Sequence, residues 1–163
     1  MSWDVTLRVP GVSWASESWN YTSNTSPMIY EAMRRAGIPL EHWPGSNAER
    51  WRMERFANGS KCGKRGPGHK TLDDLIWTPC TMTCCEPSWW QTLDGRPGPE
   101  GLKILVAVVE QWDADPDRFR AMNPRNGWGR FDTDEDDPGL RGVFTEMIAA
   151  ATTEAALVWE ASG

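Results

Sequence analysis

The sequence is poor in histidine: His42 and His69 are the only two in its 163 residues. Serine and cysteine hydrolases activate the nucleophile with a histidine base, so a site of that kind would depend on one of these two. The G-x-S-x-G turn that presents the nucleophile of α/β-hydrolases is also missing. These absences favour a non-enzymatic protein as the first hypothesis.

Phosphate-binding signatures are lacking too, since the chain has neither a Walker loop nor G-x-G-x-x-G. The stretch GKRGPGHK at 63–70 has glycines and cations but lacks the G-K-[ST] ending. Two interpretations remain for it. It binds an anion through Lys61, Lys64 and Arg65, or it is a solvated loop.

Long hydrophobic runs are absent as well. The longest, residues 104–109, is far shorter than the roughly 20 residues that cross a bilayer. The first residues, MSWDVTLRV, show no basic stretch followed by an apolar core, so we expect no secretion signal and no membrane partner. The expected location is therefore the cytoplasm.

Charge is unevenly distributed along a chain whose net charge is −6. Residues 34–70 hold nine Lys/Arg against three acids, and residues 110–163 hold twelve acids against five arginines. The pattern describes either an anion-binding half and a solvating half or two complementary faces of one fold. The overall acidity argues against general binding of duplex DNA.

The arrangement of apolar residues predicts an α+β fold in a single domain, 1–163. Residues 4–9 alternate polar and apolar side chains, which predicts a half-buried strand ended by Pro10-Gly11, and residues 12–19 are expected to return as a hairpin. Spacings of three and four residues predict amphipathic helices at 27–36, 99–112, 116–122 and 138–153. Residues 156–159 either form a final strand beside the first or continue the last helix. We expect a small antiparallel sheet packed by three or four helices.

An irregular, cysteine-containing segment is expected at about 40–92. Within it, residues 46–49 form a capping box that predicts a short helix through Phe56. A tetrahedral structural zinc site is one expectation, because thiolate and imidazole are natural zinc ligands. Its candidate ligands are Cys62, His69, Cys80 and Cys84. The absence of paired Cys-x-x-Cys motifs keeps two alternatives open: simple thiols, or a redox or catalytic cysteine.

Asp132, Asp134 and Asp136 alternate as in the first half of a calcium loop. The glycine expected sixth is Asp137 and the glutamate expected twelfth is Val143, so the segment is not an EF-hand. The simpler interpretation is a helix N-terminus whose dipole favours negative charge.

Two polar stretches, 19–28 and 123–131, are the candidate ligand site. Asparagine amides both donate and accept, so they can contact the edge of a nucleobase, and a tryptophan can stack on its face. The alternative is purely local structure, with Trp128 filling the core between two glycines. The candidate contacts are Asn20, Thr22, Asn24, Arg125, Asn126, Trp128 and Arg130, the two arginines contacting phosphate.

These two stretches resemble a family of small uncharacterised proteins found in bacteriophages and some bacteria. The resemblance is carried by N-x-T-x-N at 20–24 and N-P-x-N-G-W-G at 123–129, with Phe131 where the family has an aromatic residue. It covers residues 1–37 and 93–163, which implies that the cysteine-containing segment is an insertion. It also implies a phage or prophage origin, but no activity.

The first hypothesis for function is a phage-type accessory protein that binds a small nucleotide-like ligand, with a counter-defence role in the host cytoplasm. The second is a protein-interaction module, stabilised by zinc, that binds a host or virion protein. The third is an enzyme acting on nucleotides or modified DNA bases. Monomer and oligomer are both compatible with the sequence.

Overall fold

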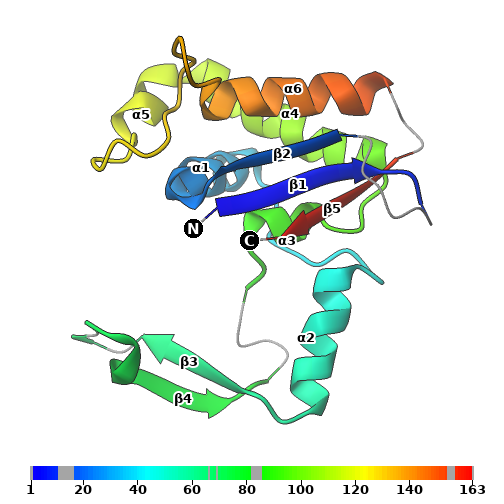
Figure 1. The fold of residues 1–163 in the computed structure, drawn as a ribbon, viewed down its shortest axis with the longest axis vertical. Coiled ribbons are helices and arrows are strands. Elements are labelled where there is room, and N and C mark those ends of the chain that lie inside the picture. Colours follow the sequence, from blue (N-terminus) through cyan, green and yellow to red (C-terminus); the bar gives the residue numbers. More distant parts are fainter. Residues whose placement is uncertain are drawn as a thin grey trace.

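The chain folds as α+β, with a three-stranded antiparallel sheet in the order β2-β1-β5 (Figure 1). The structure is a computed structural model and describes residues 2–10, 17–65, 67–68, 70–81, 86–153 and 157–162. The strands are β1 (Ser2–Arg8), β2 (Glu17–Thr22) and β5 (Val158–Ser162). Of the two alternatives for the C-terminal segment, the strand is the one found, and it pairs antiparallel with β1.

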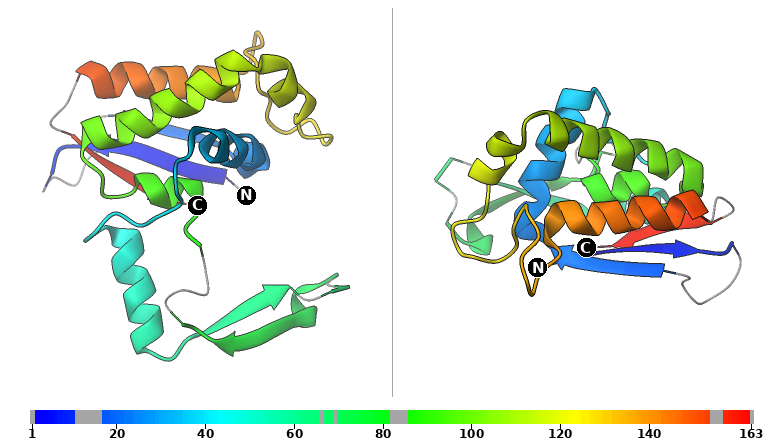
Figure 2. Two further views of the ribbon diagram at one scale, coloured as in Figure 1. Left: turned by 180° about the vertical axis from the view of Figure 1, so that it is seen from behind. Right: turned by 90° about the horizontal axis from the view of Figure 1, so that it is seen from above.

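The alternation of residues along β1 determines the two faces of the sheet. Trp3, Val5 and Leu7 are fully buried, whereas Asp4 and Thr6 point to the opposite side. The buried face lies against a layer of helices, which the view from above shows on one side of the sheet only (Figure 2). These helices are α1 (Ser26–Ala36), α4 (Gly98–Ala114) and α6 (Gly139–Thr153).

Two short helices complete the body. α5 (Pro116–Ala121) follows α4 and buries Phe119, and α3 (Trp89–Leu93) lies against β5. The core between the sheet and the helices is rich in indoles. Trp3 meets Trp89 edge-on with ring centroids 4.7 Å apart, and Trp112 meets Phe144 at 4.8 Å. Part of the tryptophan content is therefore structural.

Some boundaries differ from those expected. β2 extends to Thr22, three residues beyond the expected end. α1 begins at Ser26, one residue before the expected start, and the Ser26 hydroxyl accepts a hydrogen bond from Trp89 Nε1 at 3.2 Å. Asp115 makes no side-chain cap for α5; its carboxylate pairs with Arg35 at 3.1 Å.

Residues 40–92, expected to be irregular apart from one short helix, contain more regular structure than expected. They include the predicted helix, α2 (Asn47–Ala57), whose Glu49 N–H donates to the Ser46 hydroxyl at 3.0 Å. They also include an unpredicted antiparallel hairpin, β3 (Lys61–Arg65) and β4 (Leu75–Pro79), with a 3₁₀ turn, η2 (Leu72–Asp74), before β4. We call residues 47–80 the arm and the rest of the chain the body. The arm projects from the body below β5 (Figure 1).

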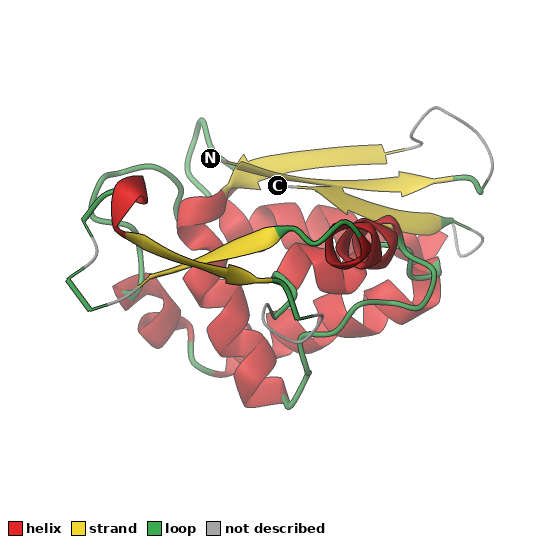
Figure 3. Cartoon of the chain, turned by 90° about the horizontal axis from the view of Figure 1, so that it is seen from below, coloured by secondary structure: helices red, strands yellow, loops and turns green. Residues whose placement is uncertain are grey.

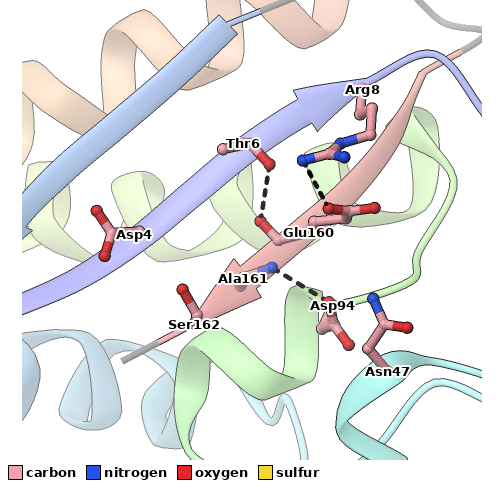
Figure 4. A pocket seen from close by; sticks show the side chains of 8 residues that line it. All are labelled: Asp4, Thr6, Arg8, Asn47, Asp94, Glu160, Ala161 and Ser162. Carbon is pink, nitrogen blue, oxygen red and sulfur yellow. Dashed lines mark hydrogen bonds and ion pairs between the residues drawn. The ribbon is translucent and has the colours of Figure 1, made fainter. Parts of the chain in front are cut away.

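A buried carboxylate joins the base of the arm to the sheet. Asp94 is 2% exposed and accepts from Ala161 N of β5 at 3.2 Å and from Ala48 N in the first turn of α2 at 2.9 Å. Figure 4 shows Asp94 between β5 and the start of α2. Arg96, 7% exposed, holds the segment before α2 in place: its guanidinium pairs with Glu41 at 3.1 Å and lies over the Trp43 ring.

Candidate functional site

The two predicted polar stretches come together at one end of the sheet, around a cavity of about 580 Å³. Five of the seven predicted contact residues line it, together with one residue of β1. The lining residues are Ser2, Asn20, Thr22, Asn24, Asn126 and Trp128. We call this the Asn/Trp cavity.

Its first wall is the outward face of the sheet, which the helices leave uncovered. Asn20 and Thr22 belong to β2 and lie opposite Asp4 and Ser2 of β1. Asn24 follows in a 3₁₀ turn, η1 (Ser23–Thr25), where its N–H donates to the Thr22 hydroxyl at 3.4 Å. The stretch is therefore strand and turn, rather than only a lead into α1.

Its second wall is the loop between α5 and α6, where Trp128 is 72% exposed. The alternative interpretation, in which this indole fills the core, is therefore wrong. Gly127 and Gly129, on either side of it, have φ of 74° and 85°, in the left-handed region that favours glycine. The Asn126 side-chain oxygen accepts from Trp128 N at 3.1 Å, which closes a local turn and leaves the indole at the cavity.

Tyr21 connects the two walls. Its hydroxyl accepts from Arg130 N at 3.0 Å and donates to the Asp137 carboxylate at 3.1 Å, across more than a hundred residues of sequence. Burial raises the pKa of Tyr21, which keeps the phenol protonated as this hydrogen bond requires. On the loop side, Asn123 accepts from the N–H of the fully buried Phe131 at 2.9 Å. No pattern in the sequence indicates these hydrogen bonds of Tyr21 and Asn123.

The lining of the cavity is polar but uncharged. The side-chain amide of Asn24 makes no hydrogen bond within the described residues, whereas Asn20 Nδ2 donates to Asp4 at 2.6 Å. Arg125 and Arg130 do not line the cavity: Arg130 pairs with Asp134, and Arg125 is exposed beside Asn126. Amides, hydroxyls and one exposed indole suit a planar ligand that both donates and accepts hydrogen bonds.

The acidic residues after the loop take part in pairing rather than forming a cation site. Asp132 pairs with Arg120 at 2.7 Å, and Asp137 accepts from Gly139 N at 2.8 Å at the start of α6. The helix-start interpretation therefore accounts for Asp137. Across the described residues, no three His, Cys, Asp or Glu side chains form a group that could hold a metal ion.

Two of the four predicted zinc ligands lie among the described residues. Cys62 lies on β3 and Cys80 directly after β4, and both are partly buried. Cys62 faces Thr78, and Cys80 N donates to Ser60 O at 2.9 Å, so the two cysteines lie on one face of the hairpin. His69 and Cys84 lie outside the described residues, and the zinc site stays a prediction.

A second cavity, of about 290 Å³, lies farther along the same sheet face (Figure 4). Its charged side chains make ion pairs and hydrogen bonds within the fold. Arg8 pairs with Glu160 at 3.1 Å, and Asp94 accepts the two backbone hydrogen bonds described above. These contacts favour a structural junction over a second ligand site.

Comparisons with protein-family models, with curated proteins and with solved structures find no match to this chain. The assignment of the site therefore rests on its own geometry. No helix among the described segments combines the length and the apolar character needed to cross a membrane.

Proposed function

We propose that the chain binds a small nucleotide-like ligand in the Asn/Trp cavity. The observation that carries the proposal is the meeting of two segments about a hundred residues apart, β2 with η1 and the loop around Trp128, at one cavity. The exposed indole offers a stacking surface for a planar ring, and the amides of Asn20, Asn24 and Asn126 offer donors and acceptors to its edge.

The uncharged lining suits the base of the ligand, with any phosphate outside the cavity. Arg125 is exposed and adjacent in sequence to Asn126, whereas the Arg130 guanidinium is already paired with Asp134. Of the two predicted phosphate contacts, Arg125 is therefore the one we propose.

The resemblance to phage proteins supports a biological setting for this binding: capture of a host signalling nucleotide in the host cytoplasm, as a counter-defence. An enzyme acting on nucleotides or modified DNA bases is the alternative for the same cavity. The side chains that line the cavity in the described residues include no carboxylate, thiol or imidazole, which favours binding over catalysis.

Calorimetry with a panel of nucleosides and of linear and cyclic nucleotides tests the proposal. For a ligand that binds, Trp128→Ala is expected to lower the affinity about tenfold or more, because stacking on an aromatic ring contributes roughly 1–3 kcal/mol per base. Trp51→Ala is the matched control, since Trp51 is 54% exposed but lies on the arm, outside the cavity. Absence of binding across the whole panel would contradict the proposal.

The arm supports a second candidate function, a protein-interaction module stabilised by zinc. Of the large apolar side chains that the described residues expose, all but Val9 and Trp128 belong to the arm. Those of the arm are Trp51, Met53, Phe56, Ile76 and Trp77. Such residues are typical of interfaces with other proteins, here a host or virion protein.

Zinc would give the hairpin the stabilisation that a core does not supply. We expect metal analysis of the purified protein to find zinc equimolar with the chain, and Cys62→Ser to reduce it sharply. Thr78→Ser, opposite Cys62 on β4, is the control that keeps all four proposed ligands. A metal-free protein that also takes up no added zinc would rule the site out.

A further inference from the structure

The arm exposes large apolar side chains on α2 and on β4. α2 has no buried residue, and Trp51 and Phe56 on it are 54% and 47% exposed. Figure 3, a view from below, shows α2 end-on with the hairpin beside it. A helix in a folded protein ordinarily buries one apolar stripe, so α2 lacks the cover that most helices have.

Each face of the hairpin carries an exposed apolar side chain. Trp77 lies opposite Gly63 on one face, and Ile76 lies opposite Lys64 on the other, yet the two side chains are 58% and 57% exposed. A two-stranded hairpin with no further layer is marginally stable in water. Burial of these apolar side chains against a partner would therefore stabilise the arm.

The charge of the arm indicates what covers it. Residues 47–80 carry seven Lys/Arg and four Asp/Glu, whereas the whole chain carries 17 and 23, so the formal charge is +3 on the arm and −9 on the body. The basic groups are interleaved with the aromatic ones: the Arg55 guanidinium lies 4.7 Å from the centre of the Trp51 ring. The covering surface must therefore be acidic and must accept tryptophan and arginine side chains.

We propose that the arm docks on the acidic body of a second copy of this chain, and that the exchange is reciprocal, giving a two-fold symmetric dimer. This inference rests on the arm being an interaction surface, as proposed above. The body of the same protein has the required sign and is present wherever the chain is made. Contact of arm with arm would bring like charges together, whereas contact of arm with body pairs opposite ones.

The size of the arm fits this role. A standard interface involves roughly 20–30 residues on each side, and residues 47–80 form a segment of comparable length. A reciprocal dimer uses each arm once and each body once, so the assembly closes at two copies. The apolar side chains supply the contact area, and the opposite charges set its orientation.

Sedimentation velocity of the full chain tests the proposal. We expect a dimer that dissociates on dilution and that weakens as salt is raised, since salt screens attraction between exposed charges. The double variant Ile76→Ser/Trp77→Ser is expected to raise the dissociation constant at least tenfold. Lys61→Glu/Lys70→Glu, which changes two exposed lysines and keeps the apolar surface, is expected to weaken the dimer too.

Trp128→Ala is the control variant, since it removes an indole that is 72% exposed but belongs to the uncharged Asn/Trp cavity, neither to the arm nor to the acidic side chains of the body. It should leave the dimer intact while weakening ligand binding in the Asn/Trp cavity, so failure of the dimer and failure of the cavity proposal are distinguishable.

Three results would overturn the dimer. They are a monomer at every concentration, a dimer unaffected by both arm variants, and a dimer that tightens when salt is added or the lysines are reversed, which indicates contact of arm with arm. A monomer whose arm binds a different acidic protein, or a single-stranded nucleic acid, also overturns it. Binding to a different acidic protein would still support the protein-interaction function proposed for the arm.

Discussion

Replacing Gly101 with alanine is expected to lower the free energy of unfolding by about 3 kcal/mol, the upper part of the usual range for an overpacked core. A β-carbon there would lie 2.2 Å from Trp159 Nε1 and 2.3 Å from its Cδ1. The Trp159 ring cannot move aside easily, because it is fully buried and its Nε1 donates to Gly98 O at 3.1 Å. The loss exceeds the roughly 1 kcal/mol that alanine gains over glycine in a helix.

Gly142→Ala is the matched control, because it makes the same change within a helix, α6. The nearest atoms to its added carbon would be Pro138 Cβ at 3.2 Å and Thr133 Oγ1 at 3.4 Å, and both residues are exposed and able to shift. We expect its stability to stay within about 1 kcal/mol of the wild type. Urea denaturation measures both variants, and equal stabilities for the two would contradict the packing argument.

The close approach at Gly101 also explains how the sheet ends at β5. The outer edge of β5 is covered by the segment before α4: Gly95 N donates to Trp159 O at 2.8 Å, and Trp159 N donates to Arg96 O at 2.9 Å. Gly101 lets α4 lie directly on the Trp159 ring. The segment before α4 is therefore close enough to form these hydrogen bonds with β5. The edge is thereby protected from pairing with another chain.

The body was predictable because its elements are periodically buried. The alternation in β1 and the three- and four-residue spacing in α1, α4 and α6 each reflect one buried face, and a buried face leaves its period in the sequence. The arm hairpin left no such period, since Ile76 and Trp77 are exposed on opposite faces. A strand with neither face buried resembles a loop in its sequence.

The candidate site was predictable in its residues but not in its geometry. Asparagine, glycine and tryptophan stood out in the stretch at 123–131 because capping alone does not explain them. The direction of Trp128 was not encoded locally, since a residue between two glycines can face either side. The hydrogen bond of Tyr21 to Asp137 joins positions 116 residues apart, and no local pattern announces it.

Gly129 lies where the loop around Trp128 approaches β2, beside the Asn/Trp cavity. A β-carbon there would lie 2.3 Å from Thr22 Cγ2 and 2.8 Å from Thr25 Cγ2. Thr22 lines the cavity and Thr25 is fully buried, so neither can give way without moving the wall or the core. The backbone φ of 85° adds strain of about 1–2 kcal/mol for any residue with a β-carbon.

Gly129→Ala is therefore expected to cost about 3 kcal/mol of unfolding free energy, from strain and overpacking together, and to abolish ligand binding as the loop moves off β2. Gly127→Ala separates the two effects: its φ is 74°, but no atom outside its immediate neighbours lies within 4 Å of the added carbon. This control should lose only about 1–2 kcal/mol and retain binding, because it carries the strain without the clash. Urea denaturation and calorimetry on both variants measure the difference. If Gly129→Ala binds as tightly as Gly127→Ala, contact between the loop and β2 does not form the cavity.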